Sequence, residues 1–113
     1  MPKAGPELDR RVAREIFGVA KPERVPRYST EDEAADLVLA RLQSPTLRCA
    51  IESFDDKWLV VWWGKIAGKS IDKSERLSTS TARSRALAIC RSALNLPASR
   101  RQPPVAARRA KKG

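Results

Sequence analysis

The sequence predicts an α+β domain in which helices pack on a three-stranded antiparallel sheet, in the order α-α-β-β-β-α. Three observations support this fold class: a capped helix start at Thr30, an apolar run from Trp58 to Trp63, and an amphipathic stretch from Ser80 to Asn95. A chain of 113 residues holds one domain with a single core. Helices that precede and follow the strands must therefore cover the sheet.

The first helix is predicted over residues 7–17. Leu8, Val12 and Ile16 recur at helical spacing, and a glycine follows that can end the helix in a left-handed conformation. Residues 1–6 contain two prolines and a glycine, so we expect a flexible lead there. A helix this short needs packing against the rest of the domain to be stable.

A second helix is predicted over residues 30–43. Thr30 with Glu33 three positions later forms a capping-box pattern, and the acids of this first turn suit the positive end of the helix dipole. Ser44-Pro45 ends the helix. Its apolar face consists of Ala35, Val38, Leu39 and Leu42.

Two strands follow and are joined by a turn. Leu47, Cys49 and Ile51 alternate with other residues at a period of two, which predicts a half-buried strand. Asp55-Asp56 marks a turn before the run from Trp58 to Trp63, which is apolar on both faces. That run is either a central strand covered on both sides or a strand that presents aromatic rings to a partner.

The polar stretch from Lys69 to Ser78 predicts a weak third strand at the edge of the sheet, because three strands joined by short turns form an antiparallel meander. The last helix is predicted to begin near Thr81, with Ser80 or Thr81 as its cap, and to end near Asn95. We therefore assign residues 7–97 to the single domain.

Positive charge is concentrated at the end of the chain. The formal net charge is +10, and residues 99–113 contribute six cations and no acid. We expect residues 98–113 to be a disordered basic tail. Such a tail can hold a polyanion without sequence preference, and the alternative is a solvated tail that keeps the protein soluble.

The residues that carry most enzyme chemistry are missing. The chain has no histidine, no glycine-rich phosphate loop and no catalytic serine motif. Cys49 and Cys90 lie among apolar neighbours and are predicted to be core thiols. Asp55-Asp56 is predicted to be a solvated turn. We expect a non-enzymatic protein with no cofactor, metal or catalytic residue.

No signal peptide or membrane span is predicted. The first residues lack an apolar core, and the run from Trp58 to Trp63 is far too short to cross a bilayer. These observations predict a cytoplasmic protein that does not bind membranes.

Three segments, Leu8–Gly18, Pro26–Ala35 and Ala86–Leu94, resemble the phage ABA sandwich domain, a family of small phage and prophage proteins. Similar sequences open with a Leu-Asp-x-x-Val-Ala helix, carry a Pro-x-Tyr-Ser-Thr entry and close with an Ala-Ile-Cys helix. The resemblance covers about residues 7–96. It implies helices, a sheet and helices in layers, and a location in the host cytoplasm, but it carries no catalytic residues.

Two functions stay open. The first is a phage-type binding domain that contacts or antagonises a host or phage protein, as a monomer or small homo-oligomer. Its candidate interface is the set of tryptophans Trp58, Trp62 and Trp63. The alternative is a nucleic-acid-binding accessory protein that in outline resembles a double-stranded-RNA-binding domain. Its candidate contacts are the cations Lys65, Lys69, Lys73, Arg83, Arg85, Arg100, Arg101, Arg108, Arg109, Lys111 and Lys112.

Overall fold

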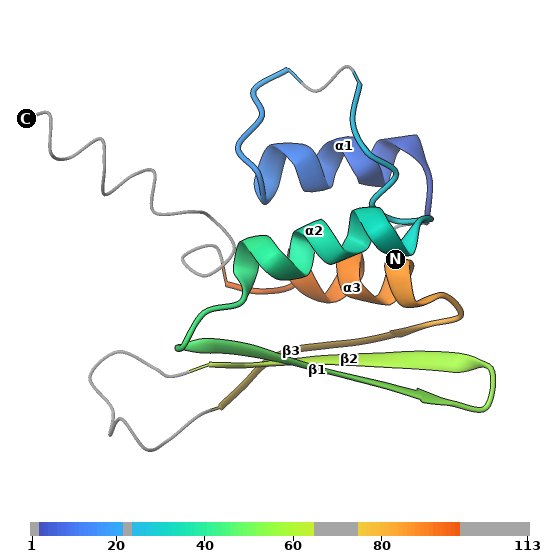
Figure 1. Cartoon of the computed structure of the whole chain (residues 1–113), viewed down its shortest axis with the longest axis vertical. Coiled ribbons are helices and arrows are strands. Elements are labelled where there is room, and N and C mark those ends of the chain that lie inside the picture. Colours follow the sequence, from blue (N-terminus) through green and yellow to red (C-terminus); the bar gives the residue numbers. More distant parts are fainter. Residues whose placement is uncertain (1–2, 22–23, 65–74, 98–113) are drawn as a thin grey trace, which may run out of the picture.

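A computed structural model describes residues 3–21, 24–64 and 75–97 of the chain (Figure 1). Helices and strands follow the predicted order α-α-β-β-β-α, which confirms the α+β class. The elements are α1 (Pro6–Glu15), α2 (Asp32–Leu42), β1 (Leu47–Phe54), β2 (Lys57–Gly64), β3 (Glu75–Ala82) and α3 (Arg85–Leu94). The predicted C-terminal tail lies outside the described residues.

The sheet is antiparallel, with strand order β1-β2-β3, so the apolar run forms the central strand. The prediction that such a central strand is covered on both sides is not confirmed, because the described helices lie on one side of the sheet (Figure 1). The predicted turn joins β1 to β2, and Asp55 adopts a φ of 54° there, a conformation that aspartate tolerates in tight turns. A bulge interrupts the pairing of β2 with β3 between Trp62 and Trp63. The extra residue on β3 is Leu77, and it packs against the core beside Ser78.

Figure 1 shows three layers: the sheet, then α2 and α3 together on one of its faces, then α1 beyond those two helices. The resemblance to the phage ABA sandwich family implies a sheet between helices. In the part of the chain that is described, however, the helices all lie on the same side of the sheet. Among the described residues, helices therefore cover one face of β2 and leave the other uncovered.

The middle layer explains the composition of α3. Leu8, Val12 and Ile16 of the α1 segment are buried, and α3 contacts α1 on one side, β2 and β3 on the other, and α2 beside it. A helix enclosed in this way is apolar around most of its circumference. Seven residues of α3 are buried, and most are small: Ala86, Ala88, Ile89, Cys90, Ser92, Ala93 and Leu94.

The predicted start of the last helix is wrong by about one turn. Residues 78–82 extend β3 instead, because Thr81 pairs with Leu59 and Ala82 with Trp58 across the ladder. The helix begins at Arg85, with Ser84 as its cap: the Ser84 hydroxyl oxygen accepts a hydrogen bond from the Leu87 backbone N–H at 3.1 Å. An alternating Ser-Thr stretch suits a strand as well as a cap, and pairing with β2 decides between them.

The predicted capping box at Thr30 is also wrong. The helix α2 begins at Asp32 after an extended Glu31, which makes no side-chain cap hydrogen bond. Thr30 belongs instead to a turn, in which its backbone N–H donates to the Arg27 carbonyl at 3.2 Å. The acids of the first helical turn still favour the helix through its dipole.

Candidate functional site

The uncovered face of the sheet is the main candidate surface. Side chains alternate along each strand, and the register places one set of positions opposite the helices and the other set on the uncovered side. We call this second set the open face. Its members are Arg48, Ala50, Glu52 and Phe54 of β1, Lys57, Leu59, Val61 and Trp63 of β2, and Arg76, Thr79 and Thr81 of β3; Arg83 follows just beyond the ladder.

The three candidate tryptophans divide between the two faces. Trp62 is completely buried against the helices, and its indole N–H donates to the Ser92 hydroxyl at 2.9 Å. Trp58 is half-buried on the same covered face. Trp63 points to the open face and keeps 42% of its surface exposed. Trp63 is therefore the tryptophan placed to meet a partner.

Apolar side chains run along the middle of the open face. Leu59 and Val61 are half-buried, and with Trp63 they form a row on the central strand. Phe54, at the opposite end of the face from Trp63, is 46% exposed. The exposed rings of Trp63 and Phe54 thus stand at the two ends of this apolar row. Apolar surface of this kind marks an interaction site.

Cations border this apolar row. Trp63 pairs with Arg48 of β1 on one side and with Arg76 of β3 on the other, and both arginines are exposed. Side chains directly opposite on neighbouring strands have Cβ atoms about 5 Å apart. Lys57 and Arg83 add two cations, whereas Glu52 is the acid among the open-face positions. The open face is therefore positively charged, most clearly around Trp63.

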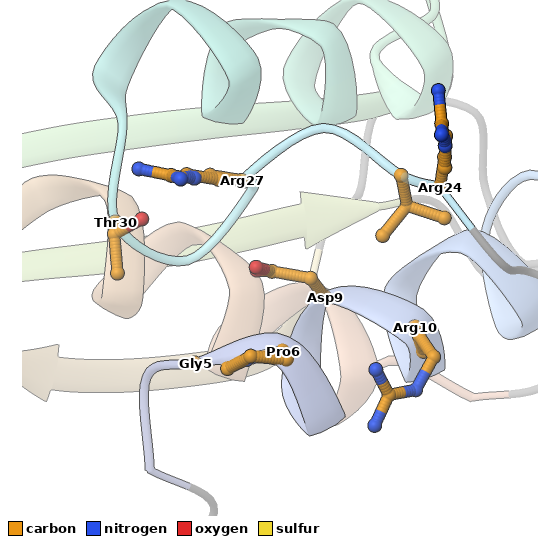
Figure 2. A pocket seen from close by; sticks show the side chains of 8 residues that line it. Gly5, Pro6, Asp9, Arg10, Arg24, Arg27 and Thr30 are labelled. Carbon is orange, nitrogen blue, oxygen red and sulfur yellow. The ribbon is translucent and has the colours of Figure 1, made fainter.

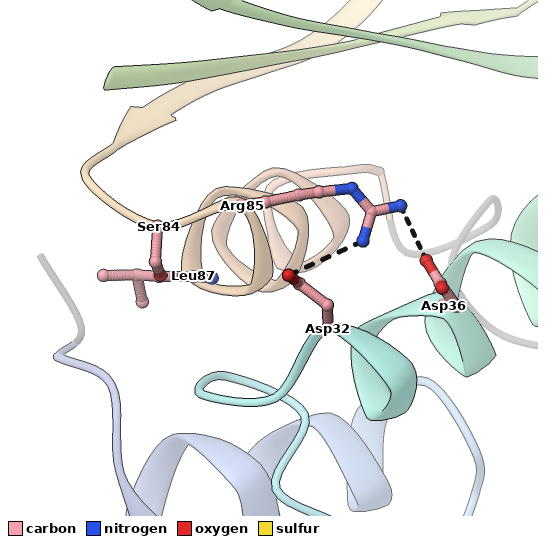
Figure 3. Close-up of polar contacts among 5 residues, drawn as sticks. All are labelled: Asp32, Asp36, Ser84, Arg85 and Leu87. Atoms are coloured by element: carbon pink, nitrogen blue, oxygen red, sulfur yellow. Dashed lines mark hydrogen bonds and ion pairs between the residues drawn. The ribbon is translucent and has the colours of Figure 1, made fainter. Parts of the chain in front are cut away.

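The candidate cations predicted for nucleic-acid binding have different fates. Arg83 is exposed at the end of β3. Arg85 is bound instead to α2: its guanidinium lies 2.6 Å from Asp36 and 3.6 Å from Asp32 (Figure 3). The hydrogen bond to Asp36 raises the pKa of Arg85, and the two acids compensate its charge. The other candidates, Lys65, Lys69, Lys73, Arg100, Arg101, Arg108, Arg109, Lys111 and Lys112, lie outside the described residues.

A pocket of about 480 Å³ lies between α1 and the segment that precedes α2 (Figure 2). Asp9 lines it and is almost fully buried. One carboxylate oxygen of Asp9 accepts hydrogen bonds from the Ser29 backbone N–H at 2.8 Å and the Ser29 hydroxyl at 2.7 Å. In Figure 2 the side chains of Arg10 and Arg24 extend away from this carboxylate. Asp9 thus acts as a clasp between two segments rather than as a catalytic acid.

Sequence analysis missed this clasp. Asp9 and Ser29 lie 20 residues apart, and the Ser29 oxygen also accepts a hydrogen bond from the Gly5 N–H at 2.9 Å. Each residue reads as an ordinary polar residue of a helix or a turn. Only the fold brings them together, although a polar residue at a helix position next to the apolar Leu8 was a weak signal.

The two cysteine thiols are unsuited to nucleophilic chemistry. Burial raises the pKa of Cys49 to about 12 and that of Cys90 to about 12. The thiolate is the reactive form, so both groups stay protonated and inert near neutral pH. Within residues 3–21, 24–64 and 75–97, no three ligand-type side chains gather to hold a metal ion. No described helix has the length and apolar character needed to cross a membrane.

Comparison with protein-family models, curated proteins and solved structures finds no match for this chain. The resemblance to the phage ABA sandwich family therefore stays a prediction. Any functional argument must start from the residues of the open face.

Proposed function

We propose that this chain is a non-enzymatic binding domain that takes nucleic acid on the open face of its sheet. The observation that carries the proposal is the composition of that face, where Arg48, Lys57 and Arg76 outnumber Glu52, the acid among the described positions that the ladders place there. A surface with this balance attracts phosphates by releasing their condensed counterions. The net charge of +10 for the whole chain favours the same class of partner.

The location matters more than the total charge. The helix α1 also carries exposed arginines, Arg10 and Arg14, but it lies on the opposite side of the domain from the open face. A polyanion attracted by charge alone would respond equally to changes on either side. A polyanion held on the open face would respond mainly to changes there.

A matched pair of charge reversals tests the proposal. Arg48→Glu with Arg76→Glu changes the open face, and Arg10→Glu with Arg14→Glu changes α1 by the same total charge. Binding of labelled DNA and RNA is measured by anisotropy at about 50 and about 200 mM salt. We expect the open-face pair to weaken binding at least about tenfold, which corresponds to about 1.4 kcal/mol of binding free energy. The α1 pair should weaken binding by less than about threefold.

Two results would contradict the proposal. If no nucleic acid binds at the lower salt concentration, the function is wrong. If both double variants weaken binding equally, the open face is not the site. Circular dichroism and thermal unfolding of each variant show whether it is folded, and the full chain is used throughout so that residues 98–113 are the same in every comparison.

A second candidate function is contact with a host or phage protein on the same face. The exposed rings of Phe54 and Trp63 favour it, because aromatic side chains commonly anchor protein interfaces. The charge around Trp63 favours nucleic acid over a protein of ordinary surface charge. Two results together would favour a protein contact on the open face. The chain binds no nucleic acid, and Trp63→Ala abolishes a self-association that light scattering detects in the unchanged protein.

A further inference from the structure

We infer that the nucleic acid taken by the open face is single-stranded, with an unpaired base stacked on the Trp63 indole between Arg48 and Arg76. This inference rests on the proposed nucleic-acid binding and names the form of its ligand. It is argued from the position of one exposed indole, from the two guanidinium groups beside it, and from the absence of a covering layer over this face in the described residues.

The first step is the exposure of Trp63. Its sequence neighbour Trp62 is fully buried and hydrogen-bonded, so the strand already satisfies its packing with the adjacent ring. Trp63 nevertheless leaves 42% of its surface in solvent, near the end of the central strand. Exposing so large an apolar ring is unfavourable in water, and a ligand that covers it gains free energy.

The second step is the pair of arginines. The ladder places Arg48 and Arg76 on the two strands that flank Trp63, so one cation stands on each side of the ring. Arg11, Arg27 and Arg85 are engaged with carboxylates, whereas no ion pair to Arg48 or Arg76 is found among the described side chains. Both guanidinium groups are exposed and are placed to meet phosphates.

The third step is the geometry of the ligand. Bases in a duplex are stacked on one another, and their faces are hidden from a flat indole, whereas a single strand can turn a base out onto an aromatic side chain. Stacking of one base on an aromatic ring contributes about 1–3 kcal/mol and tolerates any base. Leu59 and Val61 lie on the same face of β2 as Trp63, and successive side chains on that face are about 7 Å apart. They offer apolar contacts to the nucleotides next to the stacked base.

The bulge beside Trp63 supports this placement. The extra residue on β3 turns both Leu77 and Ser78 toward the core, and the Ser78 hydroxyl donates to the Ser92 carbonyl at 2.6 Å. The irregularity therefore leaves Arg76, and not an apolar side chain, opposite Trp63. Bulges commonly re-aim side chains next to functional sites.

The experiment compares short labelled single strands with a duplex of the same sequence, in the full chain and in Trp63→Ala, Trp63→Phe and Leu37→Ala. We expect the single strand to bind more tightly than the duplex and to quench part of the tryptophan fluorescence. Trp63→Ala should weaken single-strand binding by about 10- to 100-fold. Trp63→Phe should retain most of the affinity, because a phenyl ring still stacks, and it should remove the quenching.

Leu37→Ala is the control, since it truncates an exposed apolar side chain on α2, outside the open face, and should change affinity by less than about threefold. If the duplex binds as tightly as the single strand and Trp63→Ala changes neither, the stacking inference is wrong while nucleic-acid binding stands. If neither form binds at low salt, the proposed function itself is wrong. The single variant Arg48→Glu is measured as well. If Trp63→Ala and Arg48→Glu lower the slope of log affinity against log salt concentration by the same amount, Trp63 acts only by positioning the neighbouring charges. The stacking inference is then wrong.

Discussion

The two faces of the central strand β2 each carry a tryptophan in a different environment. Trp62 and Trp63 are adjacent and chemically identical, yet one is buried beneath two helices and the other is exposed beside two arginines. The covered face follows the rules of a protein interior, with buried side chains and with hydrogen bonds from Trp62 and Ser78 to α3. The open face carries an apolar row with a cationic border, which is the composition of a binding surface. Because successive side chains of a strand point to opposite faces, Trp62 can stabilise the fold while Trp63 is available to bind a ligand.

The largest expected effect is the loss of Trp62. Trp62→Ala should lower the free energy of unfolding by about 3–5 kcal/mol, because it leaves a cavity beneath α3 and removes the hydrogen bond to Ser92. Trp63→Ala is the matched change on the other face and should cost less than about 1 kcal/mol. Chemical denaturation of both variants measures the difference. Equal losses would show that the open face is packed in solution.

The next effect is a fall in stability in alkali. Burial raises the pKa of both thiols to about 12 in the folded chain, whereas in the unfolded chain they ionise near the ordinary thiol pKa of 9.0. Between these values the folded state holds more protons, so stability falls as pH rises, by at most about 1.4 kcal/mol per pH unit for each thiol. Cys90→Ala should make the fall shallower in urea unfolding at several alkaline pH values. An unchanged slope would mean that water reaches Cys90 in the folded chain.

A smaller loss is expected from adding one methyl group to the covered face. A Cβ at Gly64 would lie 2.5 Å from Leu77 Cδ1 and 3.2 Å from the Thr46 carbonyl oxygen, so Gly64→Ala must shift a side chain and the backbone. We expect a cost of about 1–3 kcal/mol. Ala50→Val enlarges a side chain on the open face and should change stability by less than about 0.5 kcal/mol. A larger effect of Ala50→Val than of Gly64→Ala in thermal unfolding would reverse the assignment of the faces.

The smallest effect should have the opposite sign. The Ser80 hydroxyl is buried on the covered face and has no hydrogen-bond partner among the described residues. Removing an unpaired buried hydroxyl is neutral or favourable, so Ser80→Ala should raise the free energy of unfolding by about 0–1 kcal/mol. Thr79→Ala, at an exposed position next to it, serves as the control. Destabilisation by more than about 1 kcal/mol on Ser80→Ala would indicate a buried water at this hydroxyl.

Local patterns determined much of the fold. The spacing of Leu8, Val12 and Ile16, the run from Trp58 to Trp63 and the small residues of the last helix predicted six elements in their order. These signals survive because helical and strand periods are properties of consecutive residues. The alternation of a strand also places Trp58 and Trp62 on one face of β2 and Trp63 on the other, whatever the strand's position in the sheet.

Tertiary structure decided which face was covered and where the elements end. Pairing with β2 drew Thr81 and Ala82 into β3, and the hydrogen bonds from Ser29 to Asp9 tie the turn before α2 to α1. Arg48 and Arg76 come to flank Trp63 only through the register of two ladders and a bulge. The physical reason is that a strand position has two possible sides with the same local sequence pattern. Long-range packing of the helices selects the side that stays in water.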